Sequence, residues 1–215
     1  MSAGPTRRRP RGLLLDAMGT LIGLRRPVGE GYAAVAASFG LGWNSDAINR
    51  IFPQVYRQAP PLAFPELDAQ ALQQAELDWW GLRIAEVLAQ AGEPPPPPEL
   101  VQALFDHYGQ ATAWRVYAEV PEQLRRWREL GLQLAVVSNF DGRLPGLLEQ
   151  LHLHHWFDAV VISSRAGAKP DPAPFHRALE ALGLSAQQTW HVGDSDDDRR
   201  GAQAAGVPFV RVRRP

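Results

Sequence analysis

Short apolar segments alternate with segments of helical periodicity in two parts of the chain, residues 12–23 and 118–215. The apolar segments are rich in Val, Ile and Leu, and most of them end at Asp, Ser or Gly. They occupy residues 12–17, 132–139, 157–164, 189–194 and 208–212. Strands of this composition are typical of a parallel sheet with helices on both faces. The pattern therefore predicts an α/β fold built on a doubly wound parallel sheet.

Helical stretches separate these predicted strands. They span residues 121–131, 142–153, 171–183 and 197–206. The first begins with Pro121, and three of the four close on a glycine. Proline is favoured in the first turn of a helix and glycine just past the last turn, so these residues mark the expected helix ends.

Residues 24–117 follow a different pattern. They contain no buried strand-like run, and helical periodicity covers residues 30–41 and 70–92. The proline run at residues 93–99 cannot lie inside a helix and predicts an extended connector before a helix that begins near Glu99. The segment is therefore predicted to be a helical domain inserted into the α/β core.

The predicted organisation thus has three parts. Residues 1–11 form a basic, disordered tail, residues 12–23 and 118–215 form the α/β core, and residues 24–117 form the inserted domain. Three tryptophans on helical patterns are interpreted as core of the inserted domain rather than as a stacking surface, namely Trp79, Trp80 and Trp114.

The amino-acid composition limits the classes of function that the protein can have. The chain has 215 residues, 45% of them hydrophobic, which excludes a disordered or fibrous protein. A formal net charge of −1 gives no global attraction to nucleic acid or to anionic lipid. Without cysteine there is no thiolate nucleophile or thiolate metal site. With no apolar run long enough for a membrane span, we expect a cytoplasmic monomer or homodimer without nucleic-acid or membrane partners.

Polar side chains follow the predicted strands where each strand ends. Asp16 follows the first, Ser138 and Asn139 end the second, and Asp194 ends the fourth. Lys169 comes after the third and is the only lysine beside twenty-one arginines. In doubly wound sheets ligands bind outside the carboxyl ends of the strands, so these side chains are expected to share one crevice. A single lysine among so many arginines indicates a functional contact that needs its compact ammonium, which a planar guanidinium cannot replace.

The segment "GDSDDD" at residues 193–198 places several acids at the start of a predicted helix. Acidic residues suit a helix N-terminus, but four acids in five residues exceed what capping requires. Asp194 at the strand end and Asp198 in the first turn of the helix are suited to hold a hard divalent cation. Mg²⁺ fits a site of carboxylate and phosphate oxygens.

These motifs, in this order, resemble those of the haloacid dehalogenase-like (HAD) hydrolases, which have a Rossmann-like core. "DAMGTL" resembles the first motif, "VVSN" the second, "KPDP" the third and "HVGDSDDD" the fourth. The position of the insertion is similar to the subfamily with a helical cap domain after the first strand. More narrowly, "LRRPVGEGYA" and "SNFDGRL" resemble the branch of rhythmically-expressed-gene-like and HAD-like hydrolase domain-containing proteins.

The resemblance implies a Mg²⁺-dependent phosphatase that acts on a small phosphorylated substrate. It implies that Asp16 is the nucleophile, that Ser138 and Lys169 hold the transferring oxygens, and that water releases an aspartyl intermediate. The implied metal ligands are Asp16, the backbone carbonyl of Met18, Asp194 and Asp198. Substrate contacts are expected from Thr20, Asn139 and Arg25.

Met18 departs from the family pattern. Most phosphatases of the family carry an aspartate two places after the nucleophile, which protonates the leaving group and later activates water. A thioether can do neither, and loss of a general acid–base typically costs about 10²–10⁴-fold in rate. The carbonyl that the family uses for the metal is still present, so binding and catalysis can be uncoupled here.

Several functions remain open at this point. The first is a phosphatase with weak or selective turnover. The second is a phosphate- or metal-binding protein, or an assembly protein, on the same scaffold. A 2-haloacid dehalogenase, with Arg25, Arg26 or Arg50 receiving the halide, fits less well because "GDSDDD" is the cation-binding form of the fourth motif. A phosphonoacetaldehyde hydrolase needs a cap lysine, and the cap has none.

Overall fold

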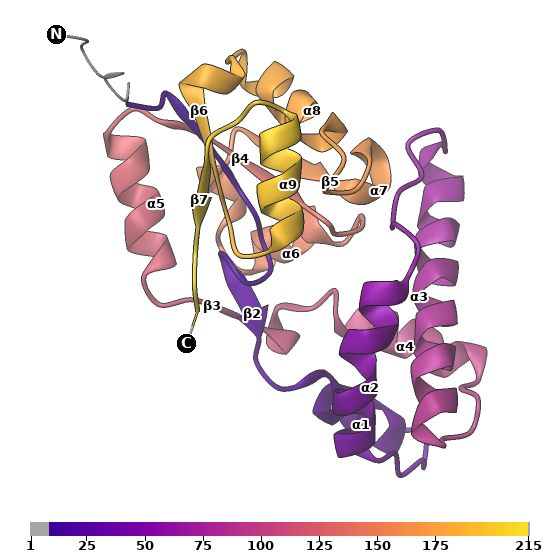
Figure 1. The fold of residues 1–215 in the computed structure, drawn as a ribbon. Helices are drawn as coiled ribbons and strands as arrows, with labels where there is room; N and C mark the ends of the chain where they lie inside the picture. The colour runs from indigo at the N-terminus through magenta and orange to yellow at the C-terminus, as the bar shows by residue number, and fades with distance from the viewer. Residues whose placement is uncertain (1–8, 215) are drawn as a thin grey trace, which may run out of the picture.

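The computed structural model describes residues 9–214. An α/β unit and a separate group of four helices lie side by side (Figure 1). The α/β unit contains one five-stranded sheet with the order β5-β4-β1-β6-β7, in which all neighbouring strands are parallel. Its strands are β1 (Gly12–Leu15), β4 (Gln133–Ser138), β5 (Ala159–Ile162), β6 (Thr189–Gly193) and β7 (Phe209–Arg211). The predicted doubly wound parallel sheet is therefore confirmed.

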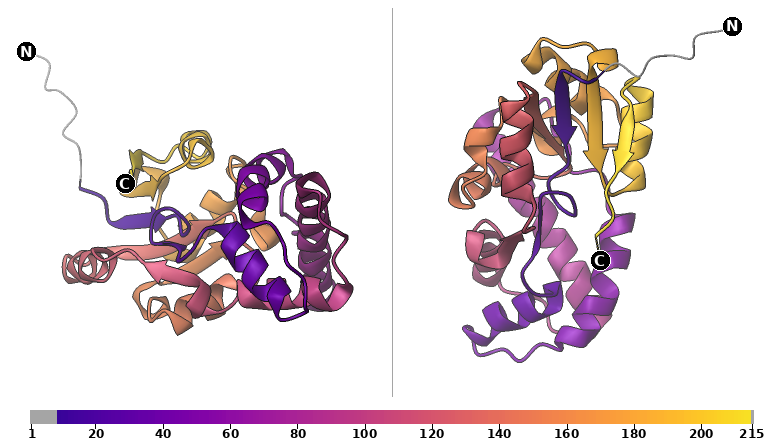
Figure 2. Two further views of the ribbon diagram at one scale, coloured as in Figure 1. Left: turned by 90° about the horizontal axis from the view of Figure 1, so that it is seen from below. Right: turned by 90° about the vertical axis from the view of Figure 1, so that its left-hand side faces the viewer.

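Helices cover both faces of this sheet (Figures 1 and 2). Alternate residues of β1 point to opposite faces, so Leu13 and Leu15 belong to one buried cluster and Leu14 to another. The first cluster includes residues of α5 (Val120–Glu129) and α6 (Leu144–Gln150). The second includes residues of α8 (Ala173–Leu182) and α9 (Asp196–Ala204). Two hydrophobic layers thus enclose the sheet.

Short helices complete the α/β unit. They are α7 (Ser163–Ala166), η2 (His154–Trp156) and η3 (Ala186–Gln188). At the start of the described chain, the backbone of Arg11 donates to Gln188 O (2.7 Å) and accepts from Gln133 N (3.0 Å). Sheet-like pairing thus begins at Arg11, which the sequence assigned to the tail. Residues 1–8 of the predicted tail lie outside the described residues.

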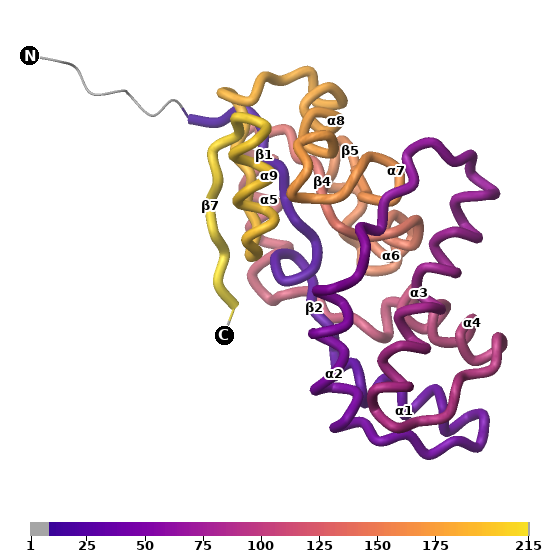
Figure 3. Tube along the Cα trace, turned by 45° about the vertical axis from the view of Figure 1, so that its right-hand side comes forward, coloured from indigo at the N-terminus to yellow at the C-terminus, as the bar shows by residue number. Residues whose placement is uncertain are grey.

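The second group of helices lies beside the α/β unit (Figure 3) and has its own hydrophobic cluster. It comprises α1 (Val28–Ala37), α2 (Ser45–Gln58), α3 (Ala69–Ala91) and α4 (Pro98–His107). The pattern did not single out α2, whose Pro53 lies inside the helix. The proline run is extended up to Pro97, and α4 starts at Pro98. Within residues 9–214, no helix combines the length and apolar character that a membrane span needs.

A small antiparallel sheet joins the two groups of elements. It pairs β2 (Ile22–Leu24) with β3 (Trp114–Val116), and the 3₁₀ helix η1 (Ala111–Ala113) precedes β3. The interpretation of Trp114 as a helical residue in the core of the inserted domain was wrong, because Trp114 is a strand residue. Its side chain is buried in the cluster under the parallel sheet. A strand of three residues is too short to give a readable alternation in the sequence.

Candidate active site

Four strand ends bring their polar side chains together at one edge of the sheet. Asp16 follows β1, which lies between β4 and β6. Ser138 at the end of β4 donates from Oγ to Asp16 Oδ1 at 3.1 Å, and Lys169 Nζ donates to the same oxygen at 2.7 Å. Asp16, Ser138 and Lys169 are all buried. The structure thus joins the three predicted catalytic residues in one hydrogen-bonded group.

The ammonium of Lys169 is fully coordinated. It donates to Asp16 Oδ1, to Asp198 Oδ1 (2.6 Å) and to the backbone carbonyl of Val137 (3.0 Å). An ammonium has three protons, so each proton has one acceptor. Burial alone would lower the pKa of Lys169, but the two carboxylates outweigh burial and raise it. Lys169 is therefore a fixed positive charge beside Asp16.

Asp198 anchors this lysine. Its Oδ1 contacts Lys169 Nζ and His191 Nε2 (2.9 Å), and its Oδ2 accepts from the backbone N and the Oγ of Ser195 at 3.0 and 2.6 Å. Burial would raise the pKa of Asp198, but the bonds from His191 and Lys169 hold it well below its ordinary value. With both oxygens engaged, Asp198 positions Lys169 and is less open to a metal than the sequence suggested.

His191 is a further residue of this group that the sequence pattern did not single out. Its other ring nitrogen, Nδ1, lies 3.0 Å from the carbonyl oxygen of Leu14, and its side chain is fully buried. A histidine in the middle of the predicted strand "TWHVGD" was the available signal. A buried imidazole requires partners for both nitrogens, and the neighbouring strand and Asp198 supply them.

The donor set fits a hard cation. Ligand atoms of Asp16, Asp194 and Asp198 lie within 4.8 Å of one another. Three carboxylates face one lysine, and burial together with the neighbouring carboxylates raises the pKa of both Asp16 and Asp194. In the part of the chain that the structure describes, Asp16 Oδ2 and the carbonyl of Met18 accept no hydrogen bond. The carbonyl of Met18 and the carboxylates of Asp194 and Asp16 would hold a bound Mg²⁺, which would supply positive charge for phosphate oxygens.

Two glycines allow the acidic residues to approach the strand ends. A Cβ on Gly19, whose φ is +82°, would lie 2.4 Å from a carboxylate oxygen of Asp194. A Cβ on Gly193 would lie 2.4 Å from Cγ of Asp198. Both distances are far below van der Waals contact, so any larger residue would displace the carboxylate.

Three residues predicted to bind substrate lie elsewhere or are otherwise engaged. Thr20 is buried and lines a different hollow, one beside α5 and β7. Arg25 is exposed, and its Nε donates to the carbonyl of Trp114 at 3.2 Å across the small sheet. The amide of Asn139 pairs with the backbone of Lys169, accepting at 2.8 Å and donating at 2.9 Å. Asn139 thus positions Lys169.

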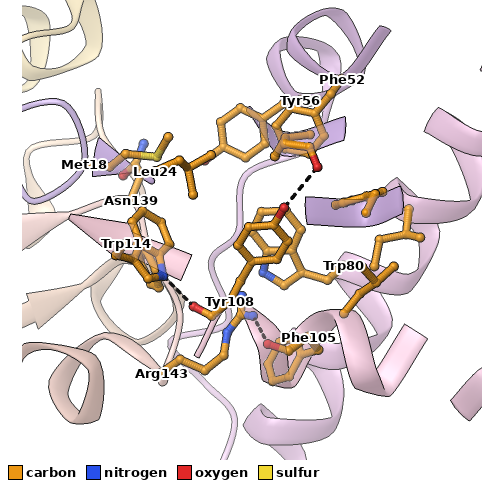
Figure 4. Close-up of a pocket in the computed structure, with 15 residues that line it drawn as sticks. Met18, Leu24, Phe52, Tyr56, Trp80, Phe105, Tyr108, Trp114, Asn139 and Arg143 are labelled. Atoms are coloured by element: carbon orange, nitrogen blue, oxygen red, sulfur yellow. Dashed lines mark hydrogen bonds between the residues drawn. The ribbon is translucent and has the colours of Figure 1, made fainter. Parts of the chain in front are cut away.

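An apolar cavity lies between the strand ends and the inserted helices (Figure 4). Its volume is about 120 Å³. On the core side it begins at Met18 and Asn139, and Met18 is 47% exposed. On the other side it is lined by aromatic residues of the inserted helices, among them Phe52, Tyr56 and Trp80. Met18 therefore faces this cavity from a position two residues after Asp16.

A second polar group, which the sequence did not predict, ties the helices to the core. Asp141 is fully buried and forms an ion pair with Arg143 at 2.6 Å. Trp80 of α3 donates from Nε1 to Asp141 at 2.7 Å, and Glu76 of α3 accepts from Gly142 N at 2.9 Å. These bonds fix α3 against the loop after β4.

The parallel sheet, the acidic strand ends and the helical insertion after β1 define a Rossmann-like α/β protein with an inserted cap. The protein-family model of the haloacid dehalogenase-like hydrolases matches residues 10–206 of this chain. The chain belongs to this family of hydrolases, as the motifs predicted.

Individual relatives agree with this assignment. The chain is 35% identical to haloacid dehalogenase-like hydrolase domain-containing protein 3 of Bos taurus, over 94% of this chain and 82% of the relative. It is 36% identical to the glyceraldehyde 3-phosphate phosphatase of Methanopyrus kandleri, over 60% of this chain and 57% of that protein. Among solved structures, a predicted phosphoglycolate phosphatase from Haemophilus somnus 129PT has a TM-score of 0.66 at 23% identity, covering 97% and 86% of the two chains.

Proposed function

We propose that the protein is a Mg²⁺-dependent phosphatase that acts on a small phosphorylated substrate through Asp16. The observation that carries this proposal is the contact of the Asp16 carboxylate with Lys169 at 2.7 Å and Ser138 at 3.1 Å, at the ends of adjacent parallel strands. The phosphatase names of relatives such as the glyceraldehyde 3-phosphate phosphatase support the same reaction class.

The chemistry follows from the two oxygens of Asp16. Oδ1 is held by Lys169 and Ser138, which leaves Oδ2 to attack phosphorus in line. The bond between phosphorus and the leaving oxygen breaks, and that oxygen departs with the electron pair. Water then attacks the aspartyl phosphate, which releases inorganic phosphate and restores the carboxylate. The positive charge of Lys169, fixed beside Asp16, stabilises negative charge on the transferring oxygens.

Met18 favours a selective enzyme within this class. No acid stands at its position, so esters whose leaving group is a weak base are favoured over simple alkyl esters. The same observation supports a second candidate, a phosphate-binding protein on the same scaffold that turns over no ester.

A hydrolysis panel separates these candidates. Aryl and alkyl phosphate monoesters and 2-haloacids are assayed with Mg²⁺ and with EDTA. Phosphate release from aryl esters that EDTA abolishes is the expected result. Halide release that EDTA does not reduce would instead identify a dehalogenase, and the absence of any product would favour the binding protein.

A further inference from the structure

We propose that the cavity over Met18 receives the leaving group of the substrate, and that this group is a single apolar, aromatic ring. The inference deepens the proposed function, on which it rests, by naming the class of ester: a phosphomonoester of a phenol. The place of the cavity is the first reason. It starts at Met18 and Asn139, neighbours in sequence of the Asp16 and Ser138 strand ends. A group bound there lies on the cap side of the attacking carboxylate.

Most polar groups on the cavity wall are already used; among the described lining residues, the hydroxyls of Tyr32 and Tyr56 make no hydrogen bond. Trp80 donates to Asp141, Trp114 donates to the carbonyl of Tyr108 at 2.9 Å, and the Tyr108 hydroxyl donates to the carbonyl of Val28 at 3.2 Å. Arg143 is paired with Asp141, and its Cζ lies 3.7 Å from the ring centroid of Phe105. A sugar phosphate would bury several hydroxyls against such a wall with few partners, and each unsatisfied group costs about 1–3 kcal/mol. The wall therefore selects against polyhydroxylated leaving groups.

The shape and size of the cavity fit one ring. Phe52, Tyr56 and Trp80 form a nearly parallel series, with ring centroids 5.9 and 6.1 Å apart and interplanar angles of 10° and 18°. Such walls favour a flat guest. The volume of about 120 Å³ is of the order of the ~150 Å³ apolar cavity that binds benzene.

The leaving-group chemistry agrees with the shape. A phenolate with a pKa near 10 departs without protonation far more readily than an alkoxide. An aromatic leaving group therefore explains both properties of position 18, a side chain that cannot donate a proton and a side chain that is apolar. Met18 then serves as the floor of the ring site, where a thioether packs well against aromatic edges.

The test is a calorimetric titration of the full-length protein in Mg²⁺ with two non-hydrolysable probes, phenylphosphonate and methylphosphonate. The two share the charged group and differ in the ring. We expect phenylphosphonate to bind at least about tenfold more tightly, because the ring removes apolar surface from water. Equal affinities, or no binding of either probe, would overturn the inference.

Two variants locate the site. Val28→Phe adds volume at the cavity wall and should remove the preference for phenylphosphonate while leaving methylphosphonate binding unchanged. Leu82→Phe is the matched control, because Leu82 is 63% exposed and is not a lining residue. A folded Val28→Phe protein that keeps the preference would refute the assigned place.

The proposed function can fail separately. Selective binding of phenylphosphonate without hydrolysis of phenyl phosphate would support the proposed ring site and refute the proposed phosphatase activity. Hydrolysis of phenyl phosphate without selective binding of phenylphosphonate would support the phosphatase activity and refute the ring site.

Discussion

The strand-end site and the cap cavity meet at Met18 but are built in opposite ways. The strand-end site is charged and held by a dense set of hydrogen bonds: Lys169 has an acceptor for each proton, and Asp198 accepts on both oxygens. The cavity is apolar, and its polar atoms bond mainly to other protein atoms. Charge pairs of the first kind fix the geometry of a reaction, whereas apolar walls discriminate by shape.

This difference separates what the family shares from what distinguishes this chain. The residues at the strand ends lie in the segments that resemble the HAD motifs, and under the proposed function they set the reaction class. The cavity is formed by side chains from α1, α2, α3 and α4 against the core. Its lining is therefore free to set substrate choice without moving Asp16, and changes in the two regions should have different kinetic signatures.

The largest expected effect falls on the strand-end site. Asp16→Asn should lower hydrolysis of every ester by about 10⁴-fold or more, because the amide cannot attack phosphorus. Steady-state assays of an aryl and an alkyl phosphate measure the loss, and binding of phenylphosphonate serves as the control for an intact cavity. A variant that keeps more than a tenth of the parent rate would show that Asp16 is not the nucleophile.

The two regions also differed in how far the sequence predicted them. The strands could be read because their apolar runs end in polar residues, and chain order alone placed Asp16, Ser138, Lys169 and Asp194 together. Thr20 and Arg25 could not be placed, since their direction depends on the turn after β1 and on the small β2–β3 sheet. Those strands of three residues leave no periodic signal.

The cavity could not be predicted for a related reason. Trp80 and Tyr56 lie on helices whose packing angles set which faces meet, and a sequence of helical periodicity does not specify those angles. Trp80 was interpreted as core of the inserted domain; it packs half-buried against the cluster of those helices and also lines the cavity. The hydrogen bond that Trp80 donates to Asp141 joins segments 61 positions apart.

The next prediction concerns Met18, where the two regions meet. Met18→Asp should raise turnover of an alkyl phosphate by about 10²-fold, since it supplies the missing acid–base. An aryl phosphate should gain less, because its leaving group hardly needs the proton and a carboxylate at the cavity floor is unfavourable for a ring. Parallel kcat measurements on the two esters give the ratio. A gain of equal size for both esters would contradict the division of roles.

A smaller effect tests the metal. A saturating excess of Mg²⁺, about a hundred times Kd, should stabilise the protein by about 2.7 kcal/mol, which corresponds to roughly 5–10 °C in Tm for a chain of this size. Asp194→Ala should remove that shift. Asp197→Ala is the control, because Asp197 pairs with Arg200 at the surface. Thermal scans with and without Mg²⁺ measure the shift in Tm. An unchanged Tm shift in Asp194→Ala would place the metal elsewhere.

The smallest expected effect concerns Glu76, which fixes the cap to the core rather than serving either region directly. Glu76 is 4% exposed, and its carboxylate accepts from Gly142 N. Burial, with a further contribution from Asp141, raises the pKa of Glu76. The folded state therefore holds this proton more tightly than the unfolded state, and between the unfolded pKa near 4.5 and the raised pKa the stability contributed by Glu76 falls as pH rises.

Glu76→Gln isolates this contribution, because the amide oxygen still accepts from Gly142 and the charge is gone. The free energy of unfolding of the parent, relative to that of Glu76→Gln, should be highest below about pH 4.5 and should decrease toward neutral pH. Urea titrations at a series of pH values measure it. Glu86→Gln, on the exposed side of the same helix, controls for the loss of a surface charge. A relative stability that rises with pH would mean that Glu76 is stabilised as an ion, and that the cap is held to the core by charge rather than by a buried neutral acid.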